Sequence, residues 1–150
     1  MIAWKYINKP SATILVLQDY TTMREIINIT PQETKELYDR MLSPGSWTMT
    51  GLPASWNPQA GEERMINCLD TLDVIQERYR QAVEYMSWFE PAWATLSNVE
   101  QQILREFYMG DNRRSGASAR LQLELNYSEA HVERLRHKAL SRLSHLLFGK

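Results

Sequence analysis

Residues 117–147 read ASARLQLELNYSEAHVERLRHKALSRLSHLL. The segment 117–126 predicts one helix and the segment 129–147 predicts another, with only Tyr127 and Ser128 between them. Ser128 is well placed to cap the second helix, because a serine hydroxyl accepts a hydrogen bond from a backbone N–H of the first turn. Two helices joined by so short a turn define a helix-turn-helix.

The last helix divides into a buried and an exposed face. Its expected buried residues are Val132, Leu135, Ala139, Leu140, Leu143, Leu146 and Leu147. Its expected exposed cations are Arg134, Arg136, Lys138 and Arg142. In the helix before it, Leu121, Leu123 and Leu125 alternate with a period of two, which suits a short strand as well as a helix.

Elsewhere, apolar residues recur at spacings of three and four, which predicts an all-α protein. A first helix is expected from Ser11 to Ile29. Thr30 and Glu33 then form a capping-box pattern with Pro31 at the first helical position, so the first arm is expected to bend or restart there, and a short helix to end at about Met41 or Leu42.

Residues 43–61 contain Pro44, Gly45, Gly51, Pro53 and Pro58, which predict a loop. The loop is unusually apolar, since it also carries Trp47, Met49, Leu52 and Trp56. It either folds back on the helices or offers an apolar surface to a partner, and folding back is favoured.

A heptad pattern follows between Glu62 and Phe89. Its members are Met65, Cys68, Leu72, Ile75, Tyr79, Ala82, Met86 and Phe89. Such a seam packs against another helix, and the first arm of the same chain is the expected antiparallel partner, with self-association as the alternative. Pro91 is expected to break this helix. Ser97 and Glu100 form a second capping box, which opens a helix running to about Met109.

The expected fold is therefore an N-terminal antiparallel, coiled-coil-like helical hairpin (1–92) followed by a helix-turn-helix domain (93–150). The formal charge is uneven along the chain. Residues 1–109 carry 9 Lys and Arg against 14 Asp and Glu, whereas residues 110–150 carry 8 against 4. A basic end beside an acidic one is typical of proteins that bind polyanions.

Other classes of function have little support in the sequence. No secretory signal or membrane-spanning segment is visible, so a cytoplasmic location with no membrane partner is expected. The three histidines, His131, His137 and His145, lack metal-ligand spacing, and Cys68 has no second thiol. Asp70 and Asp73 have no nucleophile or base beside them. We expect no enzyme, no catalytic residue, no cofactor and no metal.

Part of this sequence resembles a known family. The residues concerned are Leu96-Ser-Asn-Val-Glu100, Ile103-Leu-Arg-Glu-Phe-Tyr108, Leu125-Asn-Tyr-Ser128, Val132, and Lys138-Ala-Leu140 followed by Leu143. They are similar to the fourth conserved region of bacterial sigma factors. The front of the chain, with Gly51-Leu52-Pro53 in its loop, resembles phage and prophage regulators of the ArpU and RinA late-gene activator types. The resemblance implies a phage-derived, DNA-binding transcriptional regulator.

The resemblance also implies a set of DNA-binding residues on the last helix. Bases would be faced by Glu129, Ala130, His131, Glu133 and Arg134, and phosphates by Lys138 and Arg142, with Ser128 and His137 completing the set. Double-stranded DNA is the expected partner, and RNA polymerase and a second copy through the heptad helix are candidates. Nothing resembles the region that melts the −10 element, so a full sigma factor is not expected.

Two alternatives remain open. In one, the protein is an interaction module whose helices bind a partner and whose sigma-like end no longer binds DNA. In the other, it is the DNA-binding small subunit of a phage packaging terminase.

Overall fold

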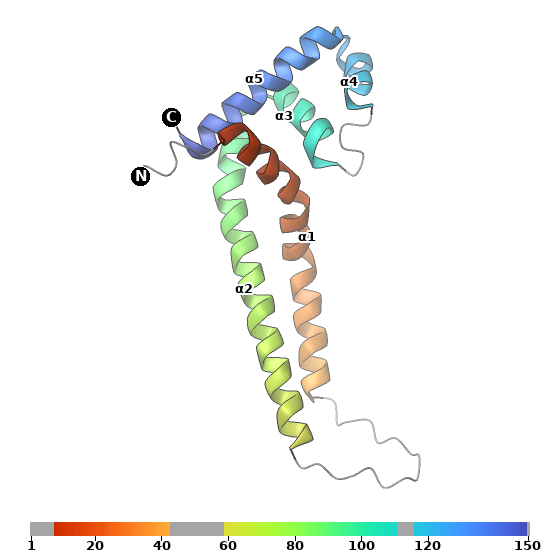
Figure 1. Ribbon diagram of the computed structural model, residues 1–150. Coiled ribbons are helices and arrows are strands. Elements are labelled where there is room, and N and C mark those ends of the chain that lie inside the picture. Colours follow the sequence, from red (N-terminus) through yellow and green to blue (C-terminus); the bar gives the residue numbers. More distant parts are fainter. Residues whose placement is uncertain (1–7, 43–58, 111–115, 150) are drawn as a thin grey trace. The chain divides into compact units, whose positions relative to one another are not determined.

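The computed structural model describes residues 8–42, 59–110 and 116–149. This part of the chain is helical and contains no strand, so the all-α class is confirmed. The helices are α1 (Lys9–Leu42), α2 (Ala60–Ala94), α3 (Asn98–Leu104), α4 (Ala117–Leu125) and α5 (Glu129–Phe148), and α3 continues into a π-helical turn, Arg105–Met109 (Figure 1). Most of the predicted apolar loop, residues 43–58, lies outside the described residues.

The chain forms two compact units. The first unit combines residues 1–24 with residues 84–150, and the second consists of residues 25–83. Both long helices therefore contribute to both units. The contacts cluster differently from the division expected at residue 92, because the beginning of α1 and the end of α2 belong with α3, α4 and α5.

Phe89 occupies the centre of the first unit's core. It is fully buried and contacts the rings of Tyr20, Tyr85 and Trp93, with centroid distances of 5.3, 5.6 and 5.6 Å. The same cluster of buried side chains extends to α3, α4 and α5; it includes Leu17, Ile103, Leu104, Leu121, Val132 and Leu143. The aromatic end of α2 thus forms part of the support for the last three helices.

Hydrogen bonds also hold the beginning of α1 within the first unit. The Tyr85 hydroxyl donates to the carbonyl of Val16 at 2.5 Å, and the Thr21 hydroxyl donates to the carbonyl of Met109 at 3.2 Å. The Lys9 ammonium donates to the carbonyl of Gly149 at 2.9 Å. Residues from both ends of the chain therefore build one core.

The second unit is a pair of helical segments, residues 25–42 of α1 and residues 60–83 of α2, which run side by side in opposite directions (Figure 1). We call these segments the helical pair. Leu37, Leu72 and Ala82 are buried in it. Glu33 of α1 forms an ion pair with Arg78 of α2.

The heptad seam of α2 is buried along part of its length. Leu72, Ala82, Met86 and Phe89 are buried and Cys68 and Ile75 are half-buried, as the pattern predicts. Met65 and Tyr79 are exposed, at 45% and 39%. The seam is therefore only partly covered in the helical pair.

The predicted helix start at Thr30 is wrong, because α1 continues through Pro31. Thr30 is buried, and its hydroxyl donates back to the carbonyl of Ile26 at 2.5 Å instead of capping a new helix. Glu33, expected in a capping box, instead pairs with Arg78. Contacts within the helical pair outweigh the local signal.

The predicted break at Pro91 is also wrong, since α2 extends to Ala94. Trp93 stacks on Phe89 and Ala92 is buried, so packing carries the helix one turn beyond the proline. The Thr95 hydroxyl donates to the carbonyl of Pro91 at 2.9 Å, satisfying one of the carbonyls left open at the helix end. The capping box of Ser97 and Glu100 is confirmed at the start of α3.

We predict that Phe89→Ala lowers the free energy of unfolding by about 3–5 kcal/mol, because it removes the central ring of the first unit and leaves a cavity. Leu123→Ala is the matched control. Leu123 is 81% exposed, and alanine favours helix, so this change should stay within about 0.5 kcal/mol. Urea denaturation of the full chain measures both values. Equal losses in the two variants would contradict this account of the core.

Candidate nucleic-acid interface

A short turn connects α4 to α5. Asn126 ends α4 in the left-handed region, with φ of 54°, a conformation that asparagine adopts more readily than most residues. Ser128 is extended, and its hydroxyl accepts a hydrogen bond from the backbone N–H of His131 at 3.3 Å. The Tyr127 ring meets His131 edge to face at 4.6 Å. The predicted cap at Ser128 is therefore confirmed. The left-handed Asn126 and the extended Ser128 together set the direction of the turn.

The structure settles the ambiguous leucine pattern before the turn. Leu121 is fully buried, Leu125 is half-buried and Leu123 is exposed. This is the distribution of a helix, in which residues four apart share a face and the residue between them does not.

The buried face of α5 follows the prediction with one exception. Val132, Ala139, Leu140, Leu143 and Leu147 are buried and Leu135 is half-buried. Leu146, expected in the core, is 40% exposed. Ser144 takes a buried position instead, because it lies on the same face as Leu140 and Leu147 and its small side chain fits there.

Arg136 is expected from the sequence to be an exposed cation, but it is half-buried and its guanidinium has partners within the chain. Its guanidinium donates to Glu133 at 2.5 Å and to the Tyr108 hydroxyl at 3.1 Å. It also lies 4.9 Å from the ring centroid of Phe107. Phe107 and Tyr108 belong to the π-helical turn. Arg136 therefore joins α5 to this turn, and Glu133 pairs with it from the same helix.

Arg142, further along α5, is exposed and also has hydrogen-bond partners within the chain. Its guanidinium donates to the Glu100 carboxylate at 2.9 Å and to the carbonyl of Thr95 at 3.3 Å. Glu100 also accepts from the backbone N–H of Ser97 at 2.8 Å. Arg142, expected as an exposed cation and as a phosphate contact, is exposed and forms an ion pair with the capping box of α3.

The electrostatics of Glu100 reflect this position. Its partial burial raises the pKa, but hydrogen bonds from Ser97 and the charge of Arg142 outweigh burial and hold the pKa of Glu100 below its ordinary value. The folded state therefore favours the ionised carboxylate. The resulting stability is present above the unfolded pKa and is lost as pH falls through the folded pKa.

The remaining candidates lie on the exposed side of α5. Glu129, Ala130, Arg134, His137 and Lys138 are exposed, and His131 is half-buried. Arg134 donates only to the carbonyl of Ala130, one turn back on the same helix, at 3.3 Å. Lys138 has no ion pair with any residue that the structure describes. We call Ala130, Arg134, His137 and Lys138 the exposed row.

Three residues that matter here were not predicted as part of the site. Glu100, Phe107 and Tyr108 hold the two arginines that the sequence assigned to the surface. Arg142 and Glu100 are 42 positions apart, so no helical spacing connects them. The only local sign for Arg136 is its place beside Leu135 and three residues before Ala139, both expected on the buried face of α5.

Comparison with protein-family models, curated proteins and solved structures gives no match to this chain. The described helices include none with the length and apolar character needed to cross a bilayer. Across residues 8–42, 59–110 and 116–149, no three His, Cys, Asp or Glu side chains gather as metal ligands would.

We predict that Arg142→Ala lowers the free energy of unfolding by about 1–2 kcal/mol near neutral pH, since it leaves the mostly buried Glu100 carboxylate without its cation. The difference from the unchanged protein should vanish in acid. It is present above the unfolded pKa of about 4.3 and disappears as pH falls through the lower folded value.

Arg134→Ala serves as the control, because it removes the same charge from the exposed row of the same helix. It should change stability by no more than about 0.5 kcal/mol at either pH. Thermal or urea unfolding at two pH values measures both variants. If Arg142→Ala were as stable as Arg134→Ala at neutral pH, the ion pair would not hold α5 to α3.

Proposed function

We propose that this protein is a DNA-binding transcriptional regulator of phage origin. In this proposal α4, the turn and α5 form a helix-turn-helix of the sigma region 4 type, and the helical pair is its N-terminal antiparallel hairpin. The observation that carries the proposal is the exposed row of α5. It presents two cations, Arg134 and Lys138, with no carboxylate partner among the described residues.

The dimensions of α5 suit a DNA groove. An α-helix with its side chains is about 10–12 Å in diameter. The major groove of B-DNA is about 12 Å wide and admits one α-helix. In helix-turn-helix proteins, residues near the start of the second helix contact the base edges. Arg134 lies in this part of α5 and can donate two hydrogen bonds to a guanine.

The ion pairs of α5 divide the predicted DNA-binding set. Arg142 and Glu133 have internal partners, so we remove them from direct contact with DNA in the proposal. Arg134 becomes the base-reading residue and Lys138 a phosphate contact. Glu129 is exposed in the first turn of α5, where its negative charge interacts favourably with the positive end of the helix dipole. The same charge would repel a DNA phosphate placed nearby.

RNA polymerase is a further partner that the sigma-like resemblance suggests for a regulator of this kind. The proposal places the protein in the cytoplasm, where its DNA target would be. It does not include the melting of promoter DNA, for which the chain has no matching segment.

We predict that the full chain binds duplex DNA with an affinity that falls steeply as salt rises, and that it selects a preferred sequence from random duplexes. Arg134→Ala should cost about 1–3 kcal/mol on that sequence and relax the preference at one base pair. Lys138→Ala should weaken binding to all sequences alike and lower the salt slope by about one. Fluorescence anisotropy over a salt series measures these effects.

Arg40→Ala is the charge-matched control, because Arg40 is exposed on α1 in the helical pair. It should leave affinity and salt slope unchanged. The regulator proposal fails if no DNA is bound at about 50 mM salt. It also fails in its assignment of residues if Arg134, Lys138 and Arg40 variants lose affinity equally.

A further inference from the structure

The two faces of the helical pair differ in charge. On one face, Glu33 of α1 and Arg78 of α2 form their ion pair. Glu36 and Arg40 lie on the same side of α1 as Glu33, at spacings of three and seven residues. This face of the pair is mainly charged, although Ile29 is exposed on the same row of α1.

The other face carries no charged residue near its centre. The helical period places two rows there, which together we call the apolar face: Ile27, Pro31, Thr34, Tyr38 and Leu42 on α1, and Met65, Leu69, Gln76, Tyr79 and Val83 on α2. Six of these are large hydrophobic residues that are 38% to 80% exposed: Tyr38, Leu42, Met65, Leu69, Tyr79 and Val83. No described residue of the helical pair covers this surface.

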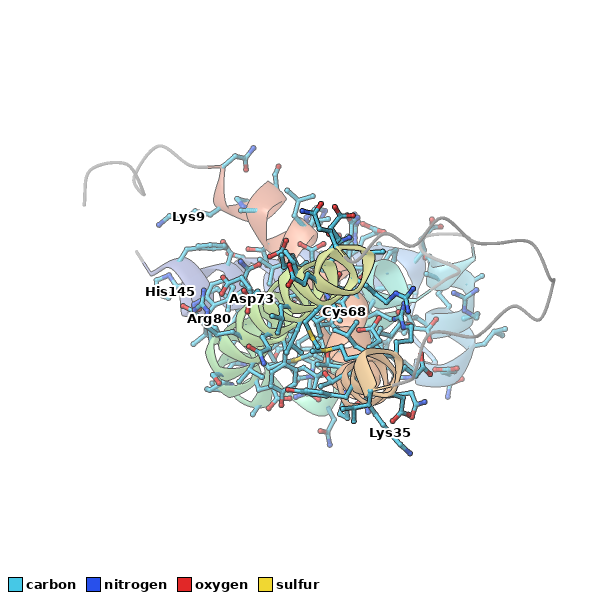
Figure 2. The ribbon with its side chains drawn as sticks, turned by 90° about the horizontal axis from the view of Figure 1, so that it is seen from below. Lys9, Lys35, Cys68, Asp73, Arg80 and His145 are labelled. Carbon is cyan, nitrogen blue, oxygen red and sulfur yellow. The ribbon has the colours of Figure 1, made fainter. Side chains whose placement is uncertain are left out.

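Charged residues lie along the edges of the apolar face. Lys35 is at the α1 edge, and Glu62 and Asp73 are at the α2 edge together with Arg80, which pairs with Glu77. Figure 2 looks along the pair and shows Lys35 on the side of α1 turned away from α2. Cys68 lies between the two helices in the same view. The apolar face is thus bordered by Lys35 on its α1 side and by a mainly acidic edge on its α2 side.

We propose that a second copy of this chain packs on this surface, apolar face against apolar face. In a two-fold symmetric contact the same patch meets itself, so any charge near the axis would face an identical charge. An uncharged centre avoids that repulsion. The product is a four-helix bundle, which buries the surface that one helical pair leaves exposed.

The area is sufficient for a weak, reversible dimer. Residues 25–42 form a segment about 27 Å long, and two adjacent helices of about 10 Å diameter make a face about 20 Å wide. Each copy therefore contributes roughly 500 Å², and the contact buries roughly 1,000 Å² in total, at the lower end for specific interfaces.

The edges are complementary across a two-fold axis parallel to the helices. Such an axis places α1 of one copy on α2 of the other. Because the pair is antiparallel and Glu33 lies level with Arg78, Lys35 lies level with about residue 76. Lys35 of one copy then comes within about one turn of Asp73 of the second copy.

Sedimentation equilibrium of the full chain tests the proposal. We expect the unchanged protein to form a dimer with a micromolar dissociation constant, on the order of 1–50 µM. Leu69→Asp should raise that constant at least tenfold, because it places two carboxylates in the contact. Val74→Asp is the matched control, since Val74 is 67% exposed on the same helix but lies outside the apolar face. It should remain a dimer.

Two further variants keep the test decisive. If Leu69→Asp does not fold, as judged by circular dichroism, Leu42→Asp replaces it, because Leu42 is 80% exposed. Lys35→Asp should weaken the dimer, and Asp73→Lys in the same chain should restore it. Lys35 and Asp73 lie on opposite edges of one copy and meet only across the proposed axis. The restoration therefore tests the direction of the two-fold axis and not a contact within one copy.

Several results would overturn the proposal. A monomer at all concentrations would show that another occupant, either a different protein or residues of the same chain, covers the face. A dimer unaffected by both Leu69→Asp and Leu42→Asp would place the contact elsewhere, and an assembly larger than a dimer would exclude a closed two-fold contact. Dimerisation does not depend on the proposed DNA binding, so Arg134→Ala should leave the dissociation constant of the dimer unchanged.

Discussion

The ion pair between Arg142 and Glu100 ties the second half of α5 to the start of α3. Glu100 is buried at the start of α3, where it also closes the capping box with Ser97. By accepting from Arg142 it fixes the second half of α5 on α3, while Arg136 fixes the middle of the same helix on the π-helical turn. Both arginines serve the fold, and the exposed row is left with Arg134 and Lys138 as its cations. In the proposed function, the charges that contact DNA and the charges that orient the helix are therefore carried by different residues.

The support for α5 reaches beyond the last third of the chain. Phe89 and Leu17 are buried in the same cluster as Leu121 and Leu143, so the long helices help to hold the proposed recognition helix. The helical pair at residues 25–83 has a different character, since it buries few side chains and exposes an apolar face. If both proposals hold, one unit reads DNA and the other joins two copies, and a two-fold regulator reads a palindromic site.

Much of the fold could be predicted from periodicity and capping. The helices, the caps at Ser97 and Ser128, and most of the buried face of α5 follow from signals within one or two turns of sequence. The prolines were misjudged because tertiary packing around Thr30 and Phe89 outweighs a local helix-breaking signal. Arg136 was misjudged as an exposed cation because its partner Tyr108 lies 28 residues away, and the ion pair of the exposed Arg142 could not be predicted because Glu100 lies 42 residues away. A helical wheel identifies an arginine as surface-facing, but it cannot show that a buried carboxylate from another helix lies beside it.

The most direct test of the central claim is to locate the DNA contact on the full chain by following backbone amide NMR shifts while duplex DNA of the selected sequence is added. The account predicts that the largest shifts fall between Ser128 and Lys138, on the turn and the first half of α5. Shifts near Arg142 and Glu100 should be smaller, since these two side chains are paired with each other. Shifts concentrated in the helical pair, or spread evenly over all basic residues, would contradict the claim that the exposed row of α5 binds DNA.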